Sequence, residues 1–145
     1  MEPSFECSCA AVRSAARAVT RAYDDALRPM QLRLTQFSIL NKVDKEGQMK
    51  LSALAERQVM DRTTMARNIK PLEREGWLTV TVGADRRERL LTVTPAGKDV
   101  LERARPLWRA VTERFEDKYG HEHIPQLRQS MSEVVRVARE ITPTE

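Results

Sequence analysis

A short run near the middle of the chain combines cations with hydrogen-bonding side chains and contains no acid. From Arg62 to Lys70 the sequence reads RTTMARNIK, with three cations and no carboxylate. Arginine can donate two hydrogen bonds to a guanine edge, asparagine can pair with adenine, and threonine can contact phosphate or a thymine methyl group. Arg67 is the first candidate for a base contact. The other candidates in this run are Arg62, Thr63, Thr64, Asn68 and Lys70. The alternative is a solvated helix face.

A second basic cluster follows later in the chain. Arg86, Arg87 and Arg89 fall within the segment DRRER, which begins at Asp85. A narrow minor groove of DNA concentrates negative potential and attracts arginine side chains. Because Asp85 would repel phosphate, we expect it to pair with a basic neighbour and to fix the turn. The alternative is an ordinary charged turn.

The elements that carry the two clusters are predicted to be a pair of short helices and a β-hairpin. One helix follows Ser52, and a second runs from Asp61, a good N-cap, to Gly76. Segments 77–82 and 90–94 are rich in β-branched residues and predict a two-stranded hairpin with the arginines in its turn. This order is that of a winged helix-turn-helix, whose second helix enters the major groove.

Amphipathic helices are predicted before this pair of helices. Apolar residues recur at helical spacing over about 8–28, and Pro29 is expected to end that helix because it disfavours α geometry at the preceding residue. A second helix is predicted to start after Thr35 as its N-cap and to stop at Gly47.

Two further helices are predicted after the hairpin. Thr94 as N-cap and Pro95 at the first helical position begin a long helix over about 95–119, and the last helix covers about 125–140. The fold class is therefore mainly α with a small β-hairpin. Proline within the second helix of the pair, Pro71, is expected to kink it, and Pro106 is expected to bend the long helix.

Composition and charge agree with a globular chain that meets a polyanion. Hydrophobic residues make up 41% and charged residues 32% of the 145 residues, and the formal net charge is +4. Residues 50–98 alone carry an excess equal to that of the whole chain. The sequence has no signal-peptide pattern and no apolar run long enough to cross a membrane, so we expect a cytoplasmic protein.

The segment LSALAERQVMDRTTMARNIKPLEREGWLTVTVGADRRERLLTVTPAG, residues 51–97, resembles the core of the MarR (multiple antibiotic resistance) regulators. The shared motifs are an LxxLA helix, a DRTTxxRxxxxLExxG recognition helix, a DxR wing and a glycine where the chain enters a long helix. LTQFSIL, beginning at Leu34, resembles the second helix of that family, and the likeness covers roughly residues 10–140.

The resemblance implies a sequence-specific transcription regulator, usually a repressor, that binds a pseudo-palindromic operator in double-stranded DNA as a homodimer. It implies one domain over 1–145, with a helical dimerisation region over 8–30 and 98–145 and the winged helix-turn-helix over 34–97. Asp85 and Arg87 take the DxR places, with Arg87 in the minor groove. The alternative to a dimer is that the apolar stripes close a monomeric core.

Members of this family are tuned by small ligands or by cysteine oxidation. The resemblance therefore implies a small aromatic or phenolic effector and no required cofactor. The pocket would be lined by Arg17, Tyr23, Met30 and Phe37. Cys7 and Cys9 are candidates for a redox sensor, with two inert thiols at a helix start as the alternative.

Other classes of function have less support in the sequence. His121 and His123 could join the two cysteines at a metal, but their spacing is poor, so we expect no metal site. No Gly-rich phosphate loop, HExxH or nucleophile elbow is present, so we expect no enzyme. A non-specific architectural DNA binder would need a stronger basic excess.

Overall fold

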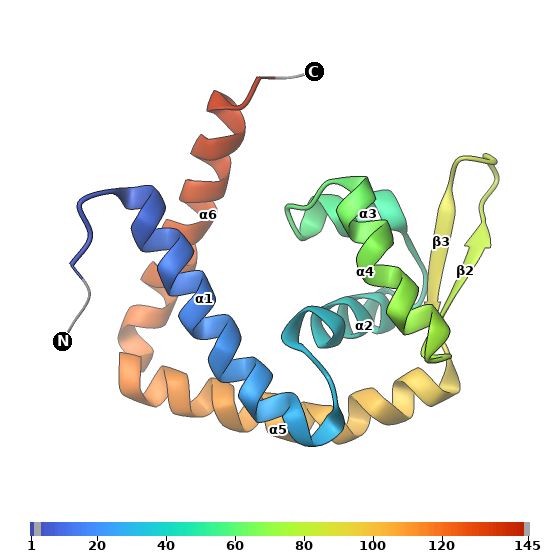
Figure 1. Cartoon of the computed structure of the whole chain (residues 1–145), viewed down its shortest axis with the longest axis horizontal. Coiled ribbons are helices and arrows are strands. Elements are labelled where there is room, and N and C mark those ends of the chain that lie inside the picture. The colour runs from blue at the N-terminus through green and yellow to red at the C-terminus, as the bar shows by residue number, and fades with distance from the viewer. Residues whose placement is uncertain (2–3, 144–145) are drawn as a thin grey trace. The chain divides into compact units, whose positions relative to one another are not determined.

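The computed structural model describes residue 1 and residues 4–143, and the chain divides into two compact units, Met1–Trp108 and Arg109–Glu145. The boundary between the two units falls inside a helix. Residues 144 and 145, the last two of the single domain expected over 1–145, lie outside the described residues. The elements in chain order are α1 (Ser8–Leu27), η1 (Arg28–Met30), α2 (Leu34–Glu46), β1 (Met49–Lys50), α3 (Leu51–Arg57), α4 (Arg62–Arg74), β2 (Leu78–Val82), β3 (Arg89–Val93), α5 (Pro95–Tyr119), η2 (His121–His123) and α6 (Ile124–Ile141) (Figure 1). The fold is mainly helical, as the sequence predicts.

The predicted hairpin is confirmed as β2 and β3, and a third strand that the sequence did not predict, β1, extends the sheet to the order β1-β3-β2. β1 pairs antiparallel with β3, with Met49 opposite Leu91 and Lys50 opposite Leu90. A strand of two residues has no periodicity that a sequence pattern could reveal. The short strand ties the entry of α3 to the first residues of β3 in the wing, the hairpin formed by β2 and β3.

Two predicted helix starts were misplaced. α2 begins at Leu34, so Thr35 lies inside it rather than at its N-cap. The Leu34 N–H donates to Asp24 Oδ1 of α1 at 2.7 Å, a capping contact from ten residues away that local pattern could not reveal. α3 begins at Leu51, so Ser52 lies within the helix and Lys50 occupies the N-cap position.

The role assigned to Pro29 also needs correction. α1 ends at Leu27, close to the predicted position, but Arg28 keeps helical dihedral angles, with φ −53° and ψ −40°. The chain continues into the 3-10 turn η1, which has proline in its first turn, and it reverses at Gln31, whose φ is +54°. The helix therefore changes type at the proline, and the turn comes after it.

α4 follows the sequence prediction closely. Asp61 is its N-cap, and its carboxylate accepts the Thr64 N–H and the Thr64 hydroxyl, each at 2.7 Å. Gly76, with φ +75°, follows its end. The helix remains α-helical through Pro71, and the kink expected there stays a prediction.

One hydrophobic core in the first unit holds the helix-turn-helix and the wing together. α4 presents one buried stripe to this core, and the sheet and the first half of α5 supply its other walls. Phe37 of α2 is 1% exposed and stacks on Trp108 with ring centroids 5.7 Å apart. Buried members from the other elements include Leu54, Met65, Ile69, Leu72, Leu78, Leu91, Leu101 and Ala104. Burial on one side of α4 leaves its other side to solvent.

Val59 in the turn between α3 and α4 has φ +55°, a conformation that costs a β-branched residue roughly 1–2 kcal/mol. Glycine adopts it without that cost. We expect Val59→Gly to be more stable than Val59→Ala by about 1 kcal/mol, the reverse of the usual order, because alanine keeps the Cβ that strains the turn. Chemical unfolding at one protein concentration measures the difference. An alanine variant equal to or above the glycine variant would show that the turn is unstrained.

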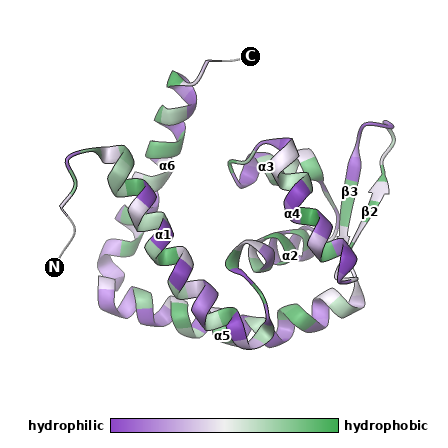
Figure 2. Ribbon diagram, viewed as in Figure 1, coloured by the Kyte–Doolittle hydropathy of each residue, from purple (hydrophilic) through white to green (hydrophobic). Residues whose placement is uncertain are grey.

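The second unit contains the end of α5, η2 and α6. Arg128 Nη2 of α6 donates to Glu116 Oε1 of α5 at 2.8 Å, and Phe115 stacks on Tyr119 at 5.7 Å. Hydrophobic residues recur along α6 (Figure 2). Those that are exposed are Met131, Val134, Val137 and Ile141, and Ile124 is the buried residue of the helix. In the described residues, no helix is both long and apolar enough to span a membrane.

Candidate nucleic-acid interface

The solvent side of α4 carries unpaired cations. Thr63, Arg67, Lys70 and Arg74 recur at helical spacing and are all exposed, on the side away from the buried stripe of α4. Within residues 4–143, the side chains of Arg62, Arg67 and Lys70 make no hydrogen bond or ion pair. These guanidinium and ammonium groups therefore keep their full donor capacity for a ligand outside the chain.

Two of the candidates on α4 are already engaged. The Thr64 hydroxyl donates to the capping carboxylate of Asp61, and Asn68 Nδ2 donates to Met60 Sδ at 3.5 Å. Asn68 is half-buried because it lies one turn from Met65 and Leu72, at the edge of the buried stripe. The structure thus brings Arg62, Thr63, Arg67 and Lys70 to the solvent side and places Asn68 towards the core.

The Asp61 carboxylate is held in its charged form at the start of α4. The Thr64 N–H, followed by the Thr64 hydroxyl, lowers the pKa of Asp61 below its usual value. This contribution to stability is present above the pKa of Asp61 in the unfolded chain and is lost as the pH falls through the lowered pKa of the folded protein. The cap therefore persists at neutral pH.

The tip of the wing is held by its own backbone. Asp85 Oδ1 accepts the Arg87 N–H at 2.9 Å, and the Asp85 carbonyl accepts the Glu88 N–H at 2.9 Å. The expected ion pair of Asp85 with a basic neighbour was wrong: among the described residues its carboxylate has no cationic partner. Asp85 fixes the turn through a main-chain N–H instead, as aspartate often does in turns.

The three arginines of the wing fall into two kinds. Arg89 Nη1 turns back to the Arg86 carbonyl at 2.7 Å and to the Glu88 carbonyl at 3.1 Å. The side chains of Arg86 and Arg87 are exposed, and in the part of the chain that is described they have no partner. The wing therefore presents two free guanidinium groups and uses the third to brace its turn.

Sequence reasoning missed a long-range ion pair at the wing turn. Lys50 Nζ lies 2.5 Å from Glu88 Oε1 and joins the N-cap position of α3 to the wing. The two residues are 38 positions apart, and only the pairing of β1 with β3 brings them together. The sequence offered no sign of this ion pair because the two-residue strand β1 could not be predicted from it.

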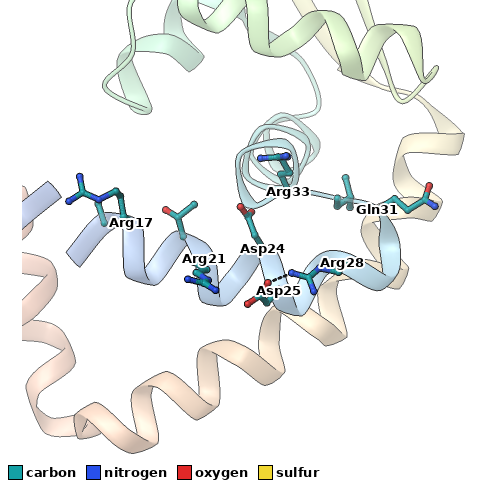
Figure 3. Close-up of a pocket in the computed structure, with 10 residues that line it drawn as sticks. Arg17, Arg21, Asp24, Asp25, Arg28, Gln31 and Arg33 are labelled. Carbon is teal, nitrogen blue, oxygen red and sulfur yellow. Dashed lines mark hydrogen bonds and ion pairs between the residues drawn. The ribbon is translucent and has the colours of Figure 1, made fainter. Parts of the chain in front are cut away.

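A recess lies along α1 in the first unit (Figure 3). Its volume is about 760 Å³. Most of its lining residues have polar or charged side chains, among them Arg17, Arg21, Asp24, Asp25, Arg28 and Arg33. Of the pocket residues named from the sequence, Arg17 lines it, whereas Tyr23, Met30 and Phe37 do not. Phe37 lies in the core instead.

The two cysteines lie at the start of α1 as free, exposed thiols. Cys7 occupies the N-cap position of α1. The N–H groups of Ala10 and Cys9 lower the pKa of the Cys7 thiol below its usual value because they stabilise the thiolate. Thiolate is the reactive form, so the lowered pKa favours nucleophilic attack by Cys7.

The histidines of η2 contact acidic neighbours in their own unit. His121 Nε2 lies 2.7 Å from Asp117 Oδ1, and His123 Nε2 lies 3.4 Å from Glu122 Oε1. Among the described residues, no group of three or more His, Cys, Asp or Glu side chains could hold a metal ion.

The family model that matches this chain is that of the MarR family, over residues 32–88. The structure of the transcriptional regulator MosR of Mycobacterium tuberculosis in complex with DNA superposes with a TM-score of 0.87, at 36% identity, over 95% of this chain and 100% of MosR. The uncharacterized HTH-type regulator YwoH of Bacillus subtilis (strain 168) is 29% identical over 83 residues, which span 57% of this chain and 61% of YwoH.

A third relative shares the fold alone. CouR from Rhodococcus jostii RHA1, solved with p-coumaroyl-CoA bound, has a TM-score of 0.77 at 18% identity, over 97% of this chain and 96% of CouR. The likeness to MosR extends over nearly the full length of both chains, and the family match covers the helix-turn-helix, β2 and the wing turn. The chain belongs to the MarR family and is a winged helix-turn-helix, DNA-binding transcription regulator, not an enzyme.

Proposed function

We propose that this regulator is a repressor that binds a pseudo-palindromic operator as a homodimer, with α4 in the major groove and the wing on the minor groove. The observation that carries the proposal is the set of unpaired cations on the exposed side of α4 and at the wing tip. Arg67 and Thr63 contact base edges, whereas Arg62 and Lys70 contact phosphate. Asn68 contributes a base contact only if it leaves Met60 Sδ.

The dimer is supported by the uncovered face of α6. Met131, Val134 and Val137 are each at least 40% exposed, and Ile141 is 79% exposed. A continuous apolar face of this kind is typical of a protein-protein contact. A second copy of the chain covers it with the same face, which yields the two-fold symmetry that a pseudo-palindromic operator requires. Two recognition helices then meet half-sites about 34–36 Å apart.

The test of the function is a titration of the purified protein against the DNA upstream of its own gene, at two salt concentrations, with unrelated DNA as control. We expect tight binding to the upstream fragment that weakens as salt rises, because phosphate contacts release counterions. Equal, weak binding to both DNAs would contradict a sequence-specific regulator at that site. Analytical ultracentrifugation of the same protein tests the dimer.

Arg87→Ala tests the wing. We expect weaker binding to every DNA by a few fold, a smaller salt dependence by about one counterion, and nearly unchanged discrimination between operator sequences. The reason is that a minor-groove arginine reads potential and width more than base identity. Arg103→Ala, which removes an exposed arginine of α5, is the control for the loss of one positive charge. Unchanged binding by Arg87→Ala would remove the wing from the interface.

A small acidic effector is proposed to tune the affinity for DNA. The recess along α1 offers guanidinium groups, and Arg21 and Arg33 have no side-chain partner among the described residues. Arginine pairs well with carboxylate, so an aromatic or phenolic acid fits this lining better than a neutral molecule. An effector shifts DNA binding only as far as it prefers one conformation of the protein over another.

Oxidation of Cys7 and Cys9 is proposed as a second means of regulation. The Cys7 thiolate attacks peroxide, which yields a sulfenic acid and a hydroxide ion, and the Cys9 thiol then displaces water to form a disulfide. We expect peroxide to weaken operator binding, at a rate that rises with pH and levels off above the lowered pKa of Cys7. A Cys7→Ser, Cys9→Ser variant that responds to peroxide like the wild type would exclude these thiols.

A further inference from the structure

An ion pair of Lys50 with Glu88 ties the wing to the helix-turn-helix. Lys50 stands where β1 passes into α3, and Glu88 ends the wing turn immediately before β3. Their side chains approach to 2.5 Å. The Lys50 side chain is 53% exposed and that of Glu88 is 29% exposed, so the lysine covers a carboxylate that would otherwise face solvent.

Glu88 is also held from the opposite side, by the wing itself. The Gly83 N–H donates to the Glu88 carbonyl at 3.1 Å, and the Glu88 N–H donates to the Asp85 carbonyl at 2.9 Å. A Cβ added to Gly83 would lie 2.7 Å from Glu88 Oε2 and 2.8 Å from Glu88 Cβ. The Glu88 side chain therefore lies directly over Gly83, with one carboxylate oxygen towards Lys50.

The carboxylate of Glu88 would oppose the binding of a polyanion to this surface. An uncompensated negative charge beside phosphate repels it, and the repulsion grows as water leaves the interface. Lys50 neutralises the charge and fixes the stem from which Arg86 and Arg87 project. Isolated exposed ion pairs contribute little to stability, so the pair is better explained by placement of the wing than by folding.

We propose that Lys50 and Glu88 form a latch that sets the position of the wing relative to the recognition helix, so that Lys50 is a positioning residue for DNA binding that acts through Glu88. The proposal rests on the proposed contact of the wing with DNA. Lys50 requires no contact with DNA of its own. Its importance follows from its hold on Glu88, which ends the wing turn.

A double-mutant cycle on the full-length protein tests the latch in the complex. We expect Lys50→Ala and Glu88→Ala each to weaken operator binding about tenfold, because either change removes the contact that holds the wing. The double variant Lys50→Ala, Glu88→Ala should bind no more weakly than either single variant, since both changes remove the same contact. Lys45→Ala, which removes an exposed lysine of α2 with no side-chain partner among the described residues, is the matched control for charge.

A second measurement needs no DNA and separates this proposal from the function on which it rests. Trypsin cuts after the wing arginines, and a released wing is cut faster. We expect faster cleavage there in Lys50→Ala and also in Gly83→Ala, which displaces Glu88 without changing any charge. If Arg87→Ala does not alter DNA binding, the proposed contact between the wing and DNA is refuted. The trypsin result then decides on its own whether Lys50 and Glu88 hold the wing in place.

The alternative is that Lys50 simply contacts phosphate. In that case Lys50→Ala lowers the salt dependence by about one counterion, Glu88→Ala binds the operator at least as tightly as the wild type, and trypsin cuts the variants at the wild-type rate. This combination of results would overturn the proposal.

Discussion

Arg67→Ala is expected to weaken binding to the operator by about 1–3 kcal/mol, roughly 5- to 150-fold, and to relax the choice of base at one position in each half-site. Arg67 stands in the middle of the exposed side of α4, and its guanidinium has no partner among the described residues. A bidentate arginine contact to guanine distinguishes that base from the other three. Its loss therefore reduces affinity and discrimination together.

The measurement is a set of titrations against the operator and against single-base variants of each half-site. Arg103→Ala, which removes an exposed arginine of α5, controls for the loss of one positive charge. If Arg67→Ala weakens binding to all of these DNAs by the same factor, Arg67 contacts phosphate, and neighbouring residues of α4 recognise the bases. Unchanged binding would exclude α4 as the recognition helix.

The sequence predicted best the elements whose ends are determined by neighbouring residues. α4 and α5 each begin with a side chain that caps its own first turn, Asp61 and Thr94 respectively, and both starts were correct. The start of α2 was misplaced because Asp24 of another helix supplies its cap. β1 was missed because its two residues form a strand only through pairing with β3.

The candidate site was predictable in residue type but not in the state of each side chain. Sequence pattern placed Arg86, Arg87 and Arg89 in one turn, yet only the folded backbone shows that Arg89 bonds to wing carbonyls. Asn68 was a natural candidate for adenine, but it follows Arg67 by one position, and that step around α4 moves the side chain from the solvent side towards the core. These distinctions depend on which atoms pack around each side chain. The local sequence pattern does not contain that information.

The joint between the wing and α5 is the place where one added methyl group should cost most. The Thr94 N–H donates to the Trp77 carbonyl at 3.0 Å, the Thr94 hydroxyl donates to the Gly76 carbonyl at 2.6 Å, and the Gly97 N–H donates to Thr94 Oγ1 at 3.1 Å. These bonds draw the first turn of α5 against the backbone that enters β2. Gly97 is buried there, and its missing side chain is what permits the approach.

Gly97→Ala is expected to lower the free energy of unfolding by about 3 kcal/mol, because the new Cβ would lie 2.2 Å from the Trp77 carbonyl oxygen and 2.8 Å from a Val93 methyl group. A backbone carbonyl cannot rotate away, so α5 must shift and weaken the bonds around Thr94. Denaturant unfolding at one fixed protein concentration measures the loss, which is well beyond the gain that alanine ordinarily brings to a helix. Ala96→Ser adds one atom at the exposed neighbouring position and should change stability by less than about 0.5 kcal/mol. A Gly97→Ala protein as stable as the wild type would show that α5 and the wing do not pack this closely.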